Sequence, residues 1–288
     1  MPDLASAFIE WYAGNARELP WRRRGFSAWG VLVSEFMLQQ TPVNRVIPHL
    51  EAWLERWPTP SALAEDAPAA ALTQWANLGY PRRALWLHRA AVEIRDRFGG
   101  QVPSEVDDLL SLTGIGDYTA RAVAVFAYGR RHPVVDVNTR RVIARVLHGR
   151  SQPGPAASRD LTDMEALLPD EPGDAAIFNA ATMELGALIC TARNPHCELC
   201  PIAGDCRWLA AGRPDTGDSR RRQATYEGSD RQARGAVLRA LRHAPDTALS
   251  RVQVAADWPD AAQRERAIAT LVADGLISAR GEVLELPR

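Results

Sequence analysis

A chain of 288 residues with 46% hydrophobic and 24% charged residues has the composition of a folded protein with one or two domains. No apolar run approaches the roughly 18 residues of a membrane span and no signal peptide opens the chain, so we expect a cytoplasmic protein. The net charge of −1 does not by itself indicate a nucleic-acid partner, and the complete absence of lysine excludes covalent catalysis through a side-chain amine.

The first two predicted helices are amphipathic. Apolar residues at helical spacing predict one helix over residues 3–16 and another over residues 28–40. Large apolar side chains mark their buried faces: Leu4, Phe8, Trp11 and Tyr12 on the first helix, and Trp29, Leu32, Val33, Phe36 and Met37 on the second.

One acidic residue interrupts the apolar face of the second helix. Glu35 lies among Val33, Phe36 and Met37 rather than on a plainly polar face. A solvated or capping glutamate is the common alternative at such a position. Because desolvation disfavours an ionised carboxylate, a buried Glu35 would be suited to donate a proton as a general acid.

The stretch over residues 43–98 keeps a helical pattern that loops interrupt at its prolines and glycines. The loop over residues 77–83 combines glycine, proline, an aromatic residue and two arginines. This composition would allow Tyr80 to stack on a base while Arg82 and Arg83 contact phosphates. An exposed turn with ordinary surface charges is the alternative interpretation.

Residues 109–138 predict a helix, a glycine hairpin and a second helix. Gly114 and Gly116 allow a tight turn with positive φ and a close approach of the backbone. The backbone N–H groups at the start of the following helix form an anion site that suits a phosphate. Asp136 comes directly after an apolar pair of valines. Because an ionised side chain is costly to bury, we interpret Asp136 as a functional residue.

Two more helices, predicted over residues 138–149 and 156–168, precede a segment that holds all four cysteines of the chain. Grouping every cysteine in one loop of a cytoplasmic protein indicates a metal centre rather than disulfides. Zinc and a [4Fe-4S] cluster both bind four thiolates, and the spacing of six, two and five residues favours the cluster. The ligands would be Cys190, Cys197, Cys200 and Cys206.

The residues after the cysteines predict a separate small module. An arginine-rich linker over residues 212–228 comes first. Helices are then predicted over residues 231–243, 250–256 and 260–274, with a hairpin over residues 276–286. Three helices and a hairpin resemble a winged helix. Such a module could contact DNA, or it could serve in packing or partner binding.

Together these motifs resemble a known family. A helix-hairpin-helix ahead of a buried aspartate, followed by cysteines at this spacing, resembles the endonuclease III superfamily of DNA glycosylases. The segment SEFMLQQT at residues 34–41 is similar to the signature of the adenine DNA glycosylases within it. The resemblance covers residues 5–210. It implies an all-α, two-lobed helix-hairpin-helix glycosylase fold with an iron-sulfur loop, to which the chain adds the winged-helix-like α+β module.

The resemblance also implies domain boundaries and partners. We expect a cluster-side helical lobe at residues 1–21 and 134–189, a six-helix barrel with the hairpin at 22–133, the iron-sulfur loop at 190–208, a linker at 209–229 and the C-terminal module at 230–288. Double-stranded DNA would bind across the cleft between the lobes. The resemblance implies a [4Fe-4S] cluster as cofactor, and we expect a monomer associated with the nucleoid.

By resemblance, the activity is hydrolysis of the N-glycosidic bond of adenine mispaired with guanine or 8-oxoguanine. The base leaves the stack, Glu35 protonates it at N7, and Asp136 stabilises the oxocarbenium ion. Asn138 matches a polar family position beside this pair. Tyr118 also lies beside it, where bifunctional members have a catalytic lysine, so no lyase step is expected. Further positions implied to contact DNA or the adenine are Arg17, Leu19, Trp21, Arg22, Gln39, Gln40, Thr41, Tyr80, Gly114 and Gly116.

Three features depart from the family pattern. Ala180 stands where many members have a Gln or Glu that contacts adenine, and Pro81 stands where many have a second tyrosine. The C-terminal module does not match the Nudix-like domain that reads 8-oxoguanine in typical members. Two alternatives stay open: a mismatch thymine or uracil glycosylase, against which Glu35 argues, and a non-catalytic iron-sulfur DNA-binding protein.

Overall fold

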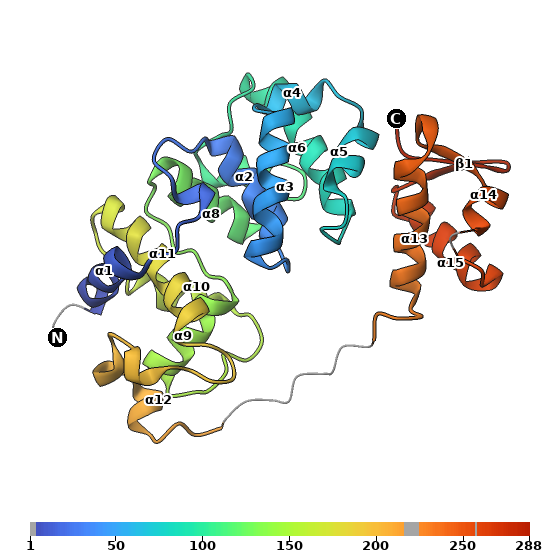
Figure 1. The fold of residues 1–288 in the computed structure, drawn as a ribbon. Coiled ribbons are helices and arrows are strands. Elements are labelled where there is room, and N and C mark those ends of the chain that lie inside the picture. The colour runs from blue at the N-terminus through green and yellow to red at the C-terminus, as the bar shows by residue number, and fades with distance from the viewer. Residues whose placement is uncertain (1–3, 216–224, 257) are drawn as a thin grey trace. The chain divides into compact units, whose positions relative to one another are not determined.

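The computed structural model describes residues 4–215, 225–256 and 258–288, which form a mostly helical chain with one small sheet (Figure 1). Contacts between residues divide the chain into two units. The first unit comprises Met1–Val31, Ser104–Leu110 and Ile115–Arg221, and the second comprises Leu32–Pro103, Ser111–Gly114 and Arg222–Arg288. Residues 216–224, in the predicted arginine-rich linker, lie outside the described residues.

The first unit is helical. Its helices are α1 (Leu4–Asn15), α7 (Val106–Leu110), α8 (Asp117–Tyr128), α9 (Val137–His148), α10 (Ser158–Glu165), α11 (Pro172–Leu188) and α12 (Arg207–Ala210), with the 3-10 turns η1 (Pro20–Arg22), η2 (Cys197–Leu199) and η3 (Ala203–Asp205). The predicted helices over residues 3–16, 138–149 and 156–168 correspond to α1, α9 and α10. We did not predict α11, because its buried residues lie on several sides of the helix and leave no clear amphipathic pattern.

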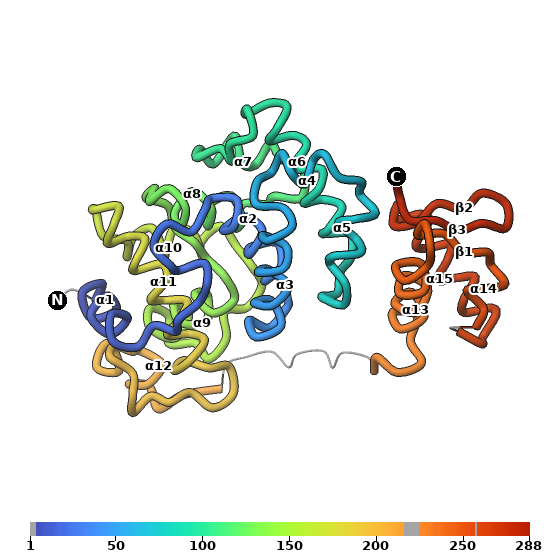
Figure 2. Tube along the Cα trace, turned by 45° about the horizontal axis from the view of Figure 1, so that its top comes forward, coloured from blue at the N-terminus to red at the C-terminus, as the bar shows by residue number. Residues whose placement is uncertain are grey.

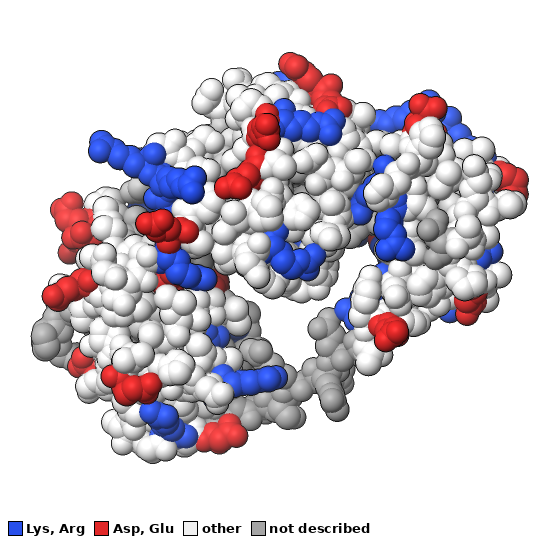
Figure 3. All heavy atoms as spheres, viewed as in Figure 1, with Lys and Arg blue, Asp and Glu red and all other residues white. Residues whose placement is uncertain are grey.

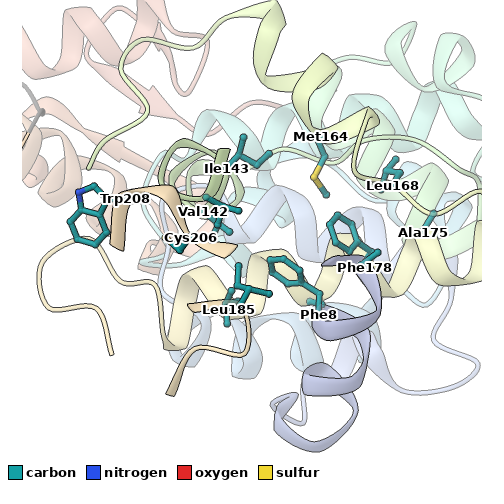
Figure 4. Close-up of a cluster of buried hydrophobic side chains, with 14 residues drawn as sticks. Phe8, Val142, Ile143, Met164, Leu168, Ala175, Phe178, Leu185, Cys206 and Trp208 are labelled. Atoms are coloured by element: carbon teal, nitrogen blue, oxygen red, sulfur yellow. The ribbon is translucent and has the colours of Figure 1, made fainter. Parts of the chain in front are cut away.

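The core of this unit joins helices that are far apart in the sequence. Figure 4 shows Phe8 of α1 and Phe178 of α11 beside each other, and their rings meet edge to face at 5.1 Å between centroids. Cys206 and Trp208 belong to the same buried cluster. The cysteine loop is therefore part of the core and not an appendage to it.

The second unit contains most of α2 (Ala28–Leu38) and the C-terminal module. Its other helices are α3 (Val43–Arg56), α4 (Pro60–Ala64), α5 (Pro68–Trp75), α6 (Arg82–Phe98), α13 (Asp230–His243), α14 (Arg251–Ala255) and α15 (Ala261–Ala273). Both α4 and α5 pack on α6. The sequence pattern predicted α2 correctly but ended it two residues late, at residue 40.

The C-terminal module has the expected helices and hairpin, and a third strand that we did not predict. Strands β2 (Ser278–Arg280) and β3 (Val283–Glu285) form the hairpin, and β1 (Ala248–Ser250) pairs with β3 to give the order β1-β3-β2 (Figure 2). Side chains of Ser229, Ser250 and Asp260 cap the three helices, each accepting a hydrogen bond from a backbone N–H. This arrangement is a small winged-helix-like fold.

The surface carries a mixture of charges. On the face shown in Figure 3, arginine and acidic side chains are interspersed rather than gathered into one large basic area. Within the described residues, no helix has both the length and the apolar character needed to cross a membrane.

Candidate active site and cluster loop

Glu35 lies in a helix that is buried on all sides. Its side chain is 6% exposed, and its neighbours Ser34, Phe36 and Met37 are all fully buried. The predicted desolvation of this carboxyl group is therefore confirmed.

Asp136 is held where α9 begins. Its Oδ1 atom accepts a hydrogen bond from the Thr139 backbone N–H at 2.7 Å, as an N-cap, and its Oδ2 atom accepts one from Asn138 Nδ2 at 2.9 Å. Asn179, fully buried in α11, accepts from the Val134 backbone N–H at 2.7 Å and so fixes the chain just before the aspartate. These donors fix the orientation of the carboxylate.

A chain of hydrogen bonds leads from this aspartate to the cysteine loop. Arg141 donates to Asn138 Oδ1 at 2.8 Å, to the Gly186 carbonyl, and to the Cys190 carbonyl at 2.7 Å. Gly186 is required at this point, because a Cβ atom there would lie 2.7 Å from Asn138 Cβ. We did not identify Arg141 or Gly186 as site residues, since nothing in the local sequence indicates this close approach.

All four cysteines line one cavity. Apolar side chains complete its wall, together with Arg145, whose Nη1 atom donates to Cys190 Sγ at 3.2 Å and whose guanidinium lies over the Trp208 ring. Burial raises the pKa of the Cys190 thiol and raises that of Cys200 to about 11. Four cysteine thiols that line one cavity are the donor set that an iron-sulfur cluster requires, so the residues present fit that group.

The first unit also brings together two of the predicted adenine-pocket residues. Arg17 and Arg22 both form ion pairs with Glu184 of α11, at 2.8 and 2.9 Å. Leu19 is buried in the core, and Trp21 is half-buried in η1. Glu184 was missed, because a single glutamate within a helix gives no sequence signal of its two distant partners.

Gln40 and Tyr80, the predicted wedge residues, lie together. The Tyr80 hydroxyl donates to Gln40 Oε1 at 2.6 Å, and the tyrosine side chain is 53% exposed. Both residues have positive φ, 57° at Gln40 and 47° at Tyr80, a backbone conformation that is strained for residues other than glycine. Such strain persists where the surroundings fix it, and it is common at functional sites.

The interpretation of Arg83 as a phosphate contact is wrong. Its side chain is 4% exposed and donates to the carbonyls of Phe36, Gln39 and Gly79. Burial lowers its pKa to about 10. Arg83 therefore joins the end of α2 to the loop at residues 77–83. Thr41 adds a weaker connection, from its hydroxyl to the Leu78 carbonyl at 3.4 Å.

Of the two hairpin glycines, Gly114 has the predicted positive φ and close packing. Its φ is +81°, and a Cβ atom there would lie 2.7 Å from Trp86 Cβ. Gly116 is different, because its φ of −99° is available to any residue and nothing would meet an added Cβ within 4 Å. The predicted positive φ is thus wrong for Gly116, which is the exposed N-cap residue of α8.

Tyr118 is the second residue of α8 and is half-buried against Ala122, Val125 and Val134. It also lines a cavity of about 330 Å³ together with Val135, the residue that precedes Asp136 in the sequence. Tyr118 therefore lines a hollow next to the segment that leads into Asp136. Ala180, whose small side chain departs from the expected family residue, is half-buried in α11.

Comparison with known families gives two matches. Residues 33–163 match the model of the HhH-GPD superfamily of base excision DNA repair proteins. Residues 190–206 match the iron-sulfur binding domain of endonuclease III, and this range begins and ends at the first and last cysteine.

Similar proteins include adenine-specific and thymine-specific enzymes. An adenine DNA glycosylase of Mycolicibacterium smegmatis is 53% identical over 270 residues, which cover 93% of this chain and 90% of the relative. A thymine/uracil-DNA glycosylase of Pyrobaculum aerophilum is 36% identical over 69% of this chain and 88% of its own. The solved structure of a thermostable thymine-DNA glycosylase superposes on 72% of this chain and 95% of its own, with a TM-score of 0.66 and 26% identity.

Proposed function

Because the chain belongs to the adenine DNA glycosylase family, we propose that it releases adenine mispaired with 8-oxoguanine or guanine in double-stranded DNA. The observation that carries this proposal is the contrast between two carboxyl groups. Glu35 is desolvated in an apolar helix, and Asp136 is held by two hydrogen-bond donors. Carboxyl groups in such different environments can act as acid and as anion in one reaction.

The proposed reaction begins with the adenine turned out of the base stack. The Glu35 carboxylic acid transfers its proton to N7 of the base, and the bond between C1′ and N9 breaks with its electron pair going to N9. The Asp136 carboxylate stabilises the positive charge that develops on the sugar. Water then adds to C1′ and loses a proton to a carboxylate, which leaves an abasic site and free adenine.

The reaction stops at the abasic site. A lyase step through a Schiff base needs an amine nucleophile, and the chain has no lysine. Tyr118 occupies the hairpin position at which the bifunctional members have that lysine. We therefore infer a monofunctional glycosylase in which Tyr118 and Asn138 complete the polar surroundings of Asp136.

The four cysteines bind the [4Fe-4S] cluster. When bound, the cluster supplies iron-thiolate bonds that tie the ends of the loop at residues 190–206 together. Arg145 holds the loop from the core side, through Cys190 Sγ and the Thr191 carbonyl. In this interpretation the cluster shapes the loop.

DNA is the partner, and we infer the finer arrangement from the site. Gln40 and Tyr80 enter the duplex opposite the displaced base, and Gln39 and Thr41 support them from the end of α2. Gly114 and Gly116 approach a phosphate at the hairpin. We keep the domain boundaries that were predicted from the sequence. We also propose that the protein acts as a monomer in the cytoplasm, associated with the nucleoid.

A single-turnover assay tests the proposal on duplexes with adenine opposite 8-oxoguanine, adenine opposite guanine, and thymine opposite guanine. We expect release of adenine, with strands left intact until treatment with base. Glu35→Gln should slow release by about 10³-fold while duplex affinity is kept. Glu51→Gln, a change at an exposed position of α3, is the matched control. Release of thymine alone would instead support a mismatch thymine glycosylase, because this chain is also similar to a thymine/uracil-DNA glycosylase.

A further inference from the structure

Glu184 is a buried carboxylate in the last part of α11 that accepts hydrogen bonds from two arginines. It is 1% exposed. Its Oε1 atom accepts hydrogen bonds from the backbone N–H of Arg17 at 2.9 Å and from Arg17 Nε at 2.8 Å. Its Oε2 atom accepts from Arg17 Nη2 at 2.8 Å and from Arg22 Nη2 at 2.9 Å. Both oxygens are thus fully used by two residues that are distant in sequence.

These bonds hold a segment that lacks regular backbone hydrogen bonds. Arg17 lies between the end of α1 and the start of η1. Arg22 donates to the Arg17 carbonyl at 3.1 Å, and its guanidinium lies 5.3 Å from the centre of the Tyr12 ring. Tyr12, Arg17 and Arg22 are therefore fixed to one another, with Glu184 as the common anchor from α11.

The charges at this cluster do not cancel. Two guanidinium groups face one carboxylate, which leaves one net positive charge. Burial opposes ionisation of Glu184, but the hydrogen bonds from Arg17 and Arg22 outweigh it and lower its pKa to about 2. The carboxylate is covered, whereas 38% of the Arg17 side chain and 22% of the Arg22 side chain remain exposed. Of these three charged side chains, the two arginines are the ones exposed enough to contact a ligand.

We propose that Glu184 is a positioning residue that sets the direction of the Arg17 and Arg22 guanidinium groups in the adenine pocket. The inference rests on the proposed function, because that function assigns these arginines to the pocket. Adenine presents ring nitrogens that accept hydrogen bonds, and the rigid fork of a guanidinium must be aimed to donate to them. Glu184 fixes that aim in the absence of the base and contacts no substrate itself.

The test separates positioning from folding by the use of two duplexes. One carries adenine opposite 8-oxoguanine, and the other carries a tetrahydrofuran abasic analogue, which has no base to fill the pocket. We expect Glu184→Gln to lower the rate of adenine release at saturating enzyme by about 10²-fold, the scale of a misaligned reactant. Affinity for the abasic duplex should stay as in the unchanged protein.

Two further variants complete the experiment. Glu184→Asp keeps the charge on a shorter arm, so its release rate should lie within about tenfold of the unchanged protein, again with normal abasic affinity. It serves as the test if the glutamine variant folds poorly. Glu171→Gln, at the exposed N-cap position of the same helix, is the control and should change neither quantity.

Two results would overturn the inference. One is a parallel loss of adenine release and abasic affinity in both Glu184 variants, which would make Glu184 a support of the fold alone. The other is unchanged release in both. Failure of the proposed function looks different, because the unchanged protein would then release no adenine from the first duplex.

Discussion

At the scale of a single residue, Glu184 makes the stability of the folded protein depend on pH in the acidic range. Its pKa is lowered from 4.5 to about 2 in the folded state, where Arg17 and Arg22 bind it and Tyr12 lies alongside. The unfolded chain therefore binds more protons than the folded chain between these two values. The stabilisation is complete above about pH 4.5 and is lost as the pH falls towards 2.

We expect the free energy of unfolding to show this difference directly. Above pH 5, Glu184→Gln should be less stable than the unchanged protein by up to about 3 kcal/mol. The gap should narrow as the pH falls from 4.5 to 3, because only the unchanged protein loses the interaction. Urea unfolding of both proteins at each pH measures the difference between their free energies of unfolding. Effects of acid that are common to both proteins cancel in this difference. A gap that stays constant would contradict the assignment, and Glu171→Gln should show none.

Residue types and local pattern predicted Glu35 and Asp136, and the family resemblance added Asn138, but three more distant supporting residues were not predicted. Glu35 was found because it lies within an apolar periodic run, and its burial is confirmed. Asp136 was found because it follows two valines. Asn179, Arg141 and Glu184 each form at least one hydrogen bond to a residue 45 or more positions away, for example Arg141 to Gly186. Local sequence spacing contains no information on such pairs.

Two glycines of α11 permit a matched test at the scale of a helix. Gly186 faces Asn138, and an added Cβ would lie 2.7 Å from its Cβ and 3.0 Å from its carbonyl oxygen. Gly173 lies in the same helix, and an added Cβ there would meet nothing within 4 Å. The two positions differ in packing and share a helical backbone.

Gly186→Ala should push α9 away and disturb Asn138, which holds Asp136. We expect a loss of about 1 to 3 kcal/mol in the free energy of unfolding, as in other overpacked cores, and adenine release slowed by about 10²-fold. Gly173→Ala should be neutral or stabilising by up to about 1 kcal/mol, because alanine is the better helix former. Thermal unfolding and single-turnover release measure both. Equal behaviour of the two variants would mean that α9 adapts to the added methyl group.

Arg82 and Arg83 provide a second matched pair, at the start of α6. Arg83 is buried and bonded to carbonyls of α2 and of the loop, while Arg82 is 52% exposed and forms a 3.6 Å ion pair with Asp274. Arg83→Ala should lower the free energy of unfolding by about 3 kcal/mol, since several carbonyls lose a charged donor. Arg82→Ala should cost less than about 1 kcal/mol. Chemical denaturation measures both values, and similar losses would show that Arg83 is not the link between α2 and the loop.

Elements with a clear periodic pattern were predicted to within a few residues, and the others were not. The hairpin of the C-terminal module was expected from alternation, and β2 and β3 confirm it. Strand β1 has three residues and no alternating pattern of burial, so only its pairing with β3 reveals it. Helix α11 was not predicted because its buried residues lie on several sides, so its sequence shows no amphipathic pattern.

At the scale of the whole chain, the cysteine loop belongs to one unit alone. Cys190 and Cys206 lie within or against the core that contains Phe8 and Phe178, and this core consists of residues of the first unit. The helices α3 to α6 belong to the second unit. Loss of the cluster should therefore loosen the first unit and spare the helices of the second.

Cys200→Ala tests this dependence by removing one ligand. We expect the purified variant to hold less than the four iron atoms of the intact cluster, and hydrogen exchange to speed up in α9 and α11 while α3 and α6 keep their protection. The buried cysteine side chains need bound iron as their partner. Core residues of the first unit, such as Val142 and Leu185, line the same cavity, so loss of the iron should disturb that core. His196→Ala, at an exposed position in the same loop, should leave both iron content and exchange unchanged. An equal loss of hydrogen-exchange protection in both units would contradict this prediction. It would show that the cluster stabilises the two units as one cooperative structure and not the core of the first unit alone.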